Sequence, residues 1–275
     1  MSATMRVMNG TLVCFHAHPD DEAIATGGVI AQAAASGRRV VLVLATRGEL
    51  GEVPDGFLDS GETLTSRRVG EVARAAEVLG IARFEFLGYH DSGMAGLPEN
   101  DAPGSFWSAD VEEAAERLAT ILRDEDAQVL VVYDENGGYG HPDHIQVHRV
   151  GVRAAELAGT PRVYEATMNA DAIARMMRER ADDLAASGIE LPDEVTDPED
   201  IKIGVPEAMI TTTVDVREFA GVKRAALAEH ASQVSDAHFF LAMPPEVFRE
   251  AFGMEWFIRR DAPPGLRESS LFDPE

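Results

Sequence analysis

The chain has a single cysteine, few basic residues and no long hydrophobic run. Cys14 cannot form an internal disulfide, and it lies in the apolar segment TLVCFH, where a thiol usually packs as a small buried hydrophobe. No segment reaches the roughly 18 consecutive apolar residues that a membrane-spanning helix requires. The segment MSATMRVMNG also lacks the basic and apolar stretches of a secretion signal. We therefore expect a cytoplasmic protein.

Basic residues are outnumbered, because 24 Lys and Arg stand against 48 Asp and Glu, which gives a net charge of -24 at pH 7. Nucleic-acid phosphates and anionic membranes would be repelled, so neither is expected as a partner. Neutral, cationic or metal-chelated ligands remain open. With 275 residues, 45% of them hydrophobic, residues 1–275 are expected to form one domain with a sizeable core.

Apolar, β-branched runs alternate with segments of helical periodicity, which predicts a mostly parallel α/β sheet with helices on both faces. Two acidic segments rich in glycine or proline, 49–61 and 188–206, interrupt this alternation and are expected to be long surface loops or lids. The expected strands are 11–16, 39–45, 83–87, 128–133, 162–167 and 209–214, and the expected helices are 21–36, 62–79, 110–125, 143–158, 169–186, 216–231 and 244–252.

Polar, reactive side chains follow the ends of the first four predicted strands. Open α/β sheets bind ligands beyond the carboxyl ends of their strands. The segments found there are HAHPDDE, TRGELGE, GYHDSG and YDENGGYGHPDH. Five of the eight histidines fall in or just after the first and last of these segments, namely His16, His18, His141, His144 and His148.

The motifs HPDD and HPDH share one spacing. If a helix begins near Asp20, His18 and Asp21 can turn toward one point, which leaves Asp20 to accept a proton. Pro142 suits the first position of a helix, so His144 would project from its first turn. Neighbouring strands would then let His18, Asp21 and His144 share one metal ion.

Two imidazoles and one carboxylate with open positions suit a hydrolytic zinc or an iron(II), and no cysteine biases the choice. His148 is a rival ligand, because it lies four residues after His144 on the same helical face. Aspartate and histidine near a helix start can also serve only as caps. The presence of two such motifs favours the metal site.

A nucleotide-binding protein on the same kind of sheet is a competing hypothesis. Such proteins need a GxGxxG turn so that phosphates can approach a helix N-terminus. Here the first turn reads HPDDEAIATGG, and its carboxylates would repel a pyrophosphate. The sequence therefore disfavours nucleotide binding.

The chain resembles the PIG-L or LmbE-like metal-dependent de-N-acetylases, which include the mycothiol-pathway deacetylase and amidase of actinobacteria. The resemblance covers most of the chain. It implies a Rossmann-like three-layer sandwich with long active-site loops, and a zinc hydrolase that removes an acyl group from an amino-sugar nitrogen. The matching segments are AHPDDE (17–22), TRGE (46–49), RRVGEVARAAEVLG (67–80), LGYHDSGMAG (87–96), YDENGGYGHPDHIQVHR (133–149) and KRAALAEHASQ (223–233).

The resemblance also implies roles for individual residues. Asp20 would be the general base, and His141 would be the electrophile or general acid, kept charged and oriented by Asp143. The Tyr139 hydroxyl would help to polarise the substrate carbonyl. The implied metal ligands are His18, Asp21 and His144.

Three residues match substrate contacts of the family, and each has a simpler alternative. Arg68 could bind hydroxyls or a phosphate, or it could form only a helix-face ion pair with Glu71. Asp91 could be a turn former, and Glu49 a solvated loop acid. A structural role is expected for His16, and no partner can be read for His90, His230 and His238.

The expected substrate is an N-acetylglucosamine-type amino sugar, first of all N-acetylglucosaminyl-inositol. The alternative is a mycothiol S-conjugate amidase. Members of that branch carry a lysine where this chain reads IATGG after HPDDEA. An antibiotic-pathway amino sugar, a free N-acetylglucosamine derivative and a homo-oligomer all remain open.

Overall fold

The alternating apolar runs form one seven-stranded sheet in the part of the chain described by the computed structural model, which is residues 10–179, 197, 199–235 and 238–272. The strand order is β3-β2-β1-β4-β5-β7-β6. The strands are β1 (Thr11–His16), β2 (Arg39–Leu44), β3 (Arg83–Phe86), β4 (Ala127–Tyr133), β5 (Arg162–Thr167), β6 (Thr212–Asp215) and β7 (Met254–Arg259).

The strands β3, β2, β1, β4 and β5 are parallel to one another. Strand β7 pairs antiparallel with both β5 and β6. This confirms the mostly parallel α/β sheet. A parallel strand needs a crossover to reach its neighbour, and the helices of this chain supply the crossovers.

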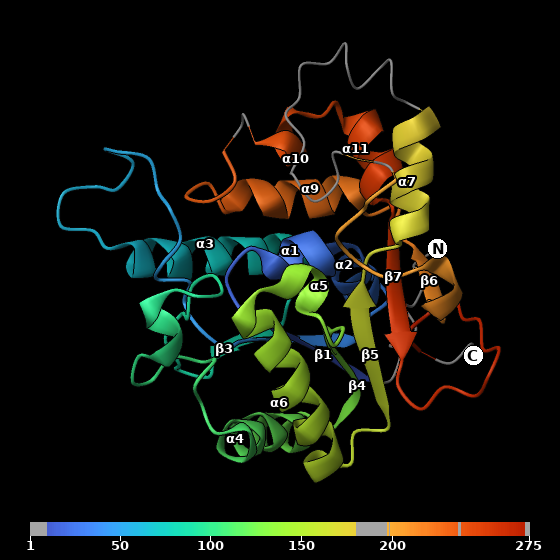
Figure 1. The fold of residues 1–275 in the computed structure, drawn as a ribbon, viewed down its shortest axis with the longest axis horizontal. Helices are drawn as coiled ribbons and strands as arrows, with labels where there is room; N and C mark the ends of the chain where they lie inside the picture. The colour runs from blue at the N-terminus through green and yellow to red at the C-terminus, as the bar shows by residue number, and fades with distance from the viewer. Residues whose placement is uncertain (1–9, 180–196, 198, 236–237, 273–275) are drawn as a thin grey trace, which may run out of the picture.

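Helices cover both faces of the sheet (Figure 1). Alternate residues of β1 point into two separate cores: Leu12 and Cys14 pack with α2, α3 and α9, and Val13 and Phe15 pack with α4 and α6. The helices are α1 (Asp21–Ala25), α2 (Gly27–Ala35), α3 (Leu64–Leu79), α4 (Val111–Asp124), α5 (Gly137–Gly140), α6 (Pro142–Ala158), α7 (Ala170–Glu179), α9 (Ala220–Glu229), α10 (Phe239–Ala242) and α11 (Pro245–Phe252), with short 3-10 turns at Pro98–Asp101 and Glu207–Met209.

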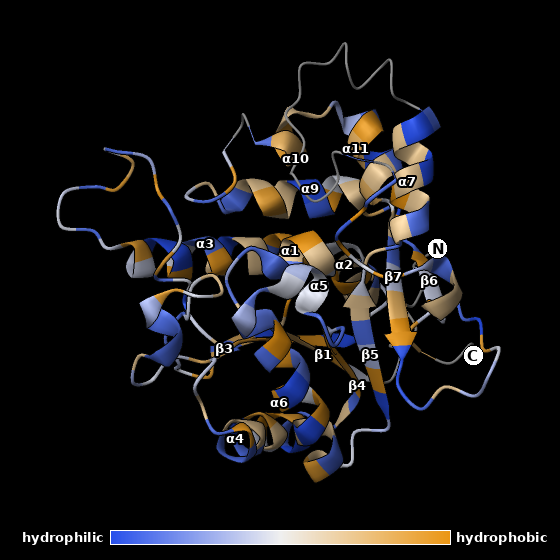
Figure 2. Ribbon diagram, in the orientation of Figure 1, coloured by the Kyte–Doolittle hydropathy of each residue, from blue (hydrophilic) through white to orange (hydrophobic). Residues whose placement is uncertain are grey.

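Hydropathy follows this layering. In Figure 2 the buried central strands carry long apolar stretches, and the outer helices α4 and α6 carry both apolar and polar residues. Within the described residues, no helix combines the length and the apolar character needed to cross a bilayer.

Some expected elements need correction. The helix expected at 21–36 is two helices that separate at Thr26, whose hydroxyl contacts His16 Nε2 at 2.8 Å and the Glu22 carbonyl at 3.1 Å. The last expected strand, 209–214, is shifted to Thr212–Asp215. Strand β7 was not expected, although it holds β6 to the rest of the sheet.

The expected helix at 169–186 is observed over Ala170–Glu179, as α7. Residues 180–186 lie outside the described residues. Most of the expected lid at 188–206 also lies outside them. Its final part, 203–205, contacts neighbouring loops, because Gly204 N donates to Gly138 O at 3.1 Å and Val205 N donates to Met168 O at 2.9 Å.

The strand order reverses between β1 and β4, because the chain passes from β1 to β2 on one side and reaches β4 on the other. A crevice opens at such a point beyond the carboxyl ends of the two strands. After β1 the chain carries His18 in the loop and Asp21 at the start of α1, and after β4 it carries Tyr139 in α5 and His144 in the first turn of α6. The fold therefore places the two motifs next to each other.

Candidate active site

Three buried imidazoles meet at the ends of β1 and β4. The ring centroids of His18 and His144 are 5.5 Å apart, and that of His141 lies 4.8 Å from His18 and 5.1 Å from His144. All three side chains are less than a tenth exposed. The convergence predicted for the HPDD and HPDH motifs is observed.

Asp21 lies between two of these imidazoles. Its Oδ2 atom is 3.4 Å from His144 Nε2 and 3.5 Å from His18 Nδ1. The same oxygen accepts a hydrogen bond from the His18 backbone N–H at 2.8 Å. One oxygen of the Asp21 carboxylate thus faces a ring nitrogen of each of the two histidines that are expected as metal ligands.

The site has donor atoms suited to a divalent cation. His144 Nε2 is buried and has no hydrogen-bond partner among the described residues. His18 Nε2 donates to Asp143 Oδ2 at 3.1 Å, which leaves Nδ1 facing Asp21. A histidine that binds a metal through one nitrogen commonly donates its other N–H to a carboxylate.

Two sets of three residues have ligand atoms within 4.8 Å of one another: His18, His141 and His144 form one set, and His18, Asp91 and Asp143 form the other. The first set differs from the expected ligands by having His141 in place of Asp21. Asp21 and His141 are therefore the two candidates for the third ligand beside His18 and His144.

Asp20 stands at the edge of this cluster in an unusual backbone conformation. Its φ is 92° and its ψ is -32°, values that residues other than glycine rarely adopt. Burial raises the pKa of the Asp20 carboxyl to about 6, and the Arg68 guanidinium opposes that rise. A carboxylate with such a pKa can both take up and release a proton near neutral pH.

Arg68 supports the Asp20 loop from α3. Its Nη1 donates to Gly48 O at 2.8 Å, and its Nη2 donates to Pro19 O and to Asp20 Oδ2, the latter at 3.3 Å. The side chain is buried. The alternative of an ion pair with Glu71 is not observed, because Glu71 binds Ser232, and the role of Arg68 toward a substrate stays a prediction.

Asp91 and Glu49 join two loops beside His18. Asp91 Oδ2 accepts from Leu50 N at 3.1 Å, and Asp91 Oδ1 accepts from Gly93 N at 2.9 Å and lies 3.5 Å from His18 Nε2. Glu49 Oε2 accepts from Asp91 N at 3.2 Å. The turn-forming alternative for Asp91 therefore describes part of its contacts, and its role toward a substrate stays a prediction.

The expected pairing of His141 with the Asp143 carboxylate is wrong. The carboxylate accepts from His18 Nε2 and from Ser92 N, the latter at 3.0 Å, and only the backbone N–H of Asp143 reaches His141, at Nδ1 and 3.1 Å. Burial and the nearby His18 and His144 lower the pKa of His141 to about 4. The lowered pKa favours the neutral imidazole, and because Nδ1 accepts from Asp143 N, the ring proton of that form lies on Nε2.

Tyr139 lies at the rim of the cluster. Its ring centroid is 5.0 Å from that of His144 and 6.2 Å from that of His141, and the residue is 44% exposed. Asp134 shapes this loop, because its Oδ1 accepts from Asn136 N at 3.0 Å and from Gly138 N at 2.9 Å. The side chain of Tyr139 is thus more exposed than the three clustered imidazoles.

Two further histidines lie away from the cluster. His148 Nδ1 bonds to Tyr133 O at 3.0 Å and lies 3.7 Å from Glu165, so the described contacts do not favour it as a ligand. His16 contacts the Tyr133 hydroxyl and Thr26, each at 2.8 Å. This agrees with the structural role expected for His16.

The sequence did not reveal the partner of His230. Its Nε2 lies 2.6 Å from Glu22 Oε1, and both side chains are fully buried. The only signal was that HPDDE and KRAALAEHASQ both belong to the matching segments, and no spacing rule joins residues so far apart.

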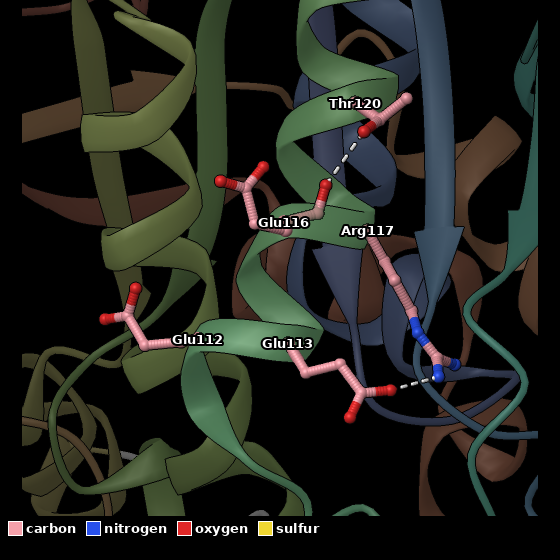
Figure 3. A pocket seen from close by; sticks show the side chains of 5 residues that line it. All are labelled: Glu112, Glu113, Glu116, Arg117 and Thr120. Carbon is pink, nitrogen blue, oxygen red and sulfur yellow. Dashed lines mark hydrogen bonds and ion pairs between the residues drawn. The ribbon is translucent and has the colours of Figure 1, made fainter.

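A separate hollow lies on the solvent side of α4 (Figure 3). Arg117 donates to Glu113 there at 2.6 Å, and Thr120 donates to the Glu116 carbonyl at 2.9 Å. The hollow contains none of the clustered histidines, and its exposed, paired side chains offer no reactive group. Its lining residues are Glu112, Glu113, Glu116, Arg117 and Thr120.

The fold is shared with solved structures of different activities. N,N'-diacetylchitobiose deacetylase from Pyrococcus horikoshii aligns with a TM-score of 0.57 and 22% identity, covering 91% of this chain and 83% of that one. GalB, the 4-carboxy-2-hydroxymuconate hydratase from Pseudomonas putida, aligns with a TM-score of 0.59 and 18% identity, covering 93% and 98%. At these identities the likeness shows the fold alone.

Sequence relatives are much closer. A 1D-myo-inositol 2-acetamido-2-deoxy-alpha-D-glucopyranoside deacetylase of Thermomonospora curvata is 43% identical over 280 residues, covering 94% of each chain. One of Acidothermus cellulolyticus is 42% identical over 280 residues, covering 95% of this chain and 94% of that one. The profile of the family described as PIG-L, GlcNAc-PI de-N-acetylase, matches residues 13–155. The chain belongs to the PIG-L family of de-N-acetylases.

Proposed function

We propose that this chain is a metal-dependent hydrolase that removes the N-acetyl group from an N-acetylglucosamine-type amino sugar, first of all N-acetylglucosaminyl-inositol. The main support is the placement of Asp20 beside the cluster of His18, Asp21 and His144. The relatives named above as deacetylases of the inositol-linked sugar support the choice of substrate.

We assign His18, Asp21 and His144 as the residues that would hold the metal. The unpartnered Nε2 of His144 and the facing oxygen of Asp21 fit such an ion. Nitrogen and oxygen donors without a thiolate suit zinc first and iron(II) second. When bound, the metal would polarise the acetamide carbonyl and make an attacking water more acidic.

The side chains of this chain would then move protons and orient the amide. Asp20 takes a proton from the water while the oxygen of that water forms a bond to the acetamide carbon. The simplest proton balance has Asp20 pass this proton to the amine nitrogen as the carbon–nitrogen bond breaks, which yields a free amine and acetic acid, and the acid then loses its proton to become acetate.

His141 and Tyr139 would stabilise the carbonyl oxygen by hydrogen bonds. A neutral His141 can donate from Nε2, since its Nδ1 already accepts from Asp143 N. The nearby positive charge of a metal would keep this imidazole neutral. This role replaces the imidazolium expected from the sequence. Arg68, Asp91 and Glu49 remain predicted substrate contacts.

The proposed partner is thus a small amino sugar. A cytoplasmic location and assembly into a homo-oligomer are further proposals, for which the sequence composition and the family resemblance are the only support.

The second candidate function is cleavage of a mycothiol S-conjugate, which also breaks an amide on the sugar nitrogen. The IATGG segment in place of a lysine favours the deacetylase. A single screen separates the two activities, because N-acetylglucosaminyl-inositol releases acetate and the S-conjugate releases an acyl group that still carries its substituted sulfur. We expect amine release from the acetylated sugar to be faster and to stop with a chelator. Faster release from the S-conjugate would reverse the assignment, and no release from any acetylated sugar would contradict the function.

A further inference from the structure

A buried carboxylate joins His230 to Asp20. Glu22 Oε1 accepts from His230 Nε2 at 2.6 Å, and Glu22 Oε2 accepts from the Asp20 backbone N–H at 3.0 Å. Glu22 and His230 are both fully buried. The two oxygens of one side chain therefore connect the end of α9 to the loop that carries Asp20.

The Asp20 backbone needs such support. Its φ of 92° lies in a region that an aspartate rarely occupies, and such a conformation persists only where surrounding contacts fix it. Its carbonyl accepts from Ala23 N and Ile24 N, each at 3.0 Å. Its N–H is held by Glu22. Both backbone polar groups of Asp20 are thus fixed, one by helix α1 and the other by the Glu22–His230 pair.

His230 is itself held firmly in place. Its carbonyl accepts from Gln233 N at 2.9 Å and from Val234 N at 2.8 Å, which closes a turn after α9. Ser232 in that turn donates its N–H and its hydroxyl to Glu71 of α3, at 2.9 and 2.6 Å. Helix α3 also carries Arg68, which reaches Pro19 O and the Asp20 carboxylate. The packed helices α3 and α9 therefore fix Asp20 from two sides.

We propose that His230 is a positioning residue for Asp20 and acts through the Glu22 carboxylate. The proposal rests on the role of Asp20 as the base. Without the imidazole, the Glu22 side chain is free to turn away from the Asp20 N–H, and the Asp20 loop relaxes away from its strained conformation. Misplacement of a reacting group by about 1 Å can lower a rate on the order of 100-fold.

The test compares His230→Ala with His230→Gln, because a glutamine amide can still donate to Glu22. Amine release from N-acetylglucosaminyl-inositol is measured together with bound metal and unfolding temperature. We expect His230→Ala to lower kcat on the order of 100-fold while KM and bound metal stay at parental values. His230→Gln should recover most of the lost kcat. Parental kcat in His230→Ala, or no recovery in His230→Gln, would overturn the proposal.

A matched control distinguishes positioning from general damage to α9. Lys223 is another buried residue of α9, and its Nζ donates to Glu255 Oε1 at 2.7 Å, away from Asp20. Lys223→Met should lower the unfolding temperature at least as much as His230→Ala and leave kcat near the parental value. An equal fall in kcat for both variants would mean that His230 acts only on stability, which overturns the proposal.

A double variant tests the path through Glu22. His230→Ala should lower kcat no further when Glu22→Ala is already present, and additive losses would show that the path is wrong. If His230→Ala does not fold, Glu22→Gln with His230→Leu replaces the pair by neutral side chains of similar size. The same loss of kcat is expected there, and parental kcat would overturn the proposal.

Asp20→Asn in the same assay separates the two levels of the proposal. If Asp20→Asn loses activity and the His230 variants do not, only the positioning role fails. If Asp20→Asn keeps parental kcat, the assignment of the base itself is wrong.

Discussion

His144 Nε2 lies 3.4 Å from Asp21 Oδ2, although the two residues belong to helices that follow different strands, α6 after β4 and α1 after β1. The contact exists because β1 and β4 are neighbours at the point where the strand order reverses. The same oxygen also faces His18 Nδ1 at 3.5 Å. Asp21 Oδ2 therefore connects the HPDD motif to the HPDH motif, and the proposed metal site depends on this carboxylate.

Replacement of Asp20 should separate catalysis from metal binding. Asp20→Asn keeps the size of the side chain and removes its capacity to accept a proton. We expect kcat to fall by about 100-fold to 10,000-fold, the usual contribution of a general base. Bound metal, measured by elemental analysis, should remain at the parental level. A variant that loses its metal in parallel with its activity would point to Asp20 as a ligand instead.

Tyr139→Phe tests the proposed hydrogen bond to the substrate carbonyl. The ring would keep its contacts with His141 and His144, and only the hydroxyl would be lost. Loss of one hydrogen bond in the transition state should lower kcat roughly 10-fold. Steady-state kinetics would show this as a change in kcat with little change in KM. An unchanged kcat would remove Tyr139 from the mechanism.

Glu125 provides a test of stability against pH. Hydrogen bonds from Arg39 of β2 and Arg83 of β3 lower the pKa of its carboxyl from 4.5 to about 2. A carboxyl group whose pKa is lowered in the folded state stabilises the fold at pH values above its ordinary pKa of 4.5. This contribution is lost as the pH falls from 4.5 toward 2. Glu125→Gln should therefore lower the free energy of unfolding by about 1 kcal/mol at neutral pH, and the difference should shrink in acid.

Urea unfolding at several pH values measures this difference. Glu113→Gln is the control, because the ion pair of Glu113 among the described residues is with Arg117 on the exposed face of α4. Its effect should stay below about 0.5 kcal/mol. The ion pairs of Glu125 would be contradicted if Glu125→Gln and the parent chain differed in their free energy of unfolding by the same amount at every pH.

Much of the fold could be predicted because the central strands β1, β2 and β4 are nearly continuous buried runs. The bounds of β1 and β5 agree with the expected segments 11–16 and 162–167. Strand β7 could not be predicted in this way, because its burial alternates and its partners β5 and β6 are distant in sequence. The break at Thr26 depends on a contact with His16, which helical periodicity does not reveal.

The convergence of the site was also predictable, since two motifs of the same spacing follow neighbouring strands. The direction of each side chain was not. The Asp143 carboxylate turns to His18 and Ser92 instead of His141, and Arg68 turns inward to Asp20. These choices depend on which polar groups remain unpaired after the loops have packed, and sequence spacing carries no such information.

The most direct test of the metal site is the amount of bound metal in Asp21→Ala and His141→Ala. We expect the parent chain and a His148→Gln control to bind one divalent ion per chain, because His148 contacts Tyr133 O instead of the cluster. Asp21→Ala should lose this ion, whereas His141→Ala should keep the ion and lose activity. Full metal occupancy in Asp21→Ala together with loss of metal in His141→Ala would contradict the assignment and identify His18, His141 and His144 as the ligands.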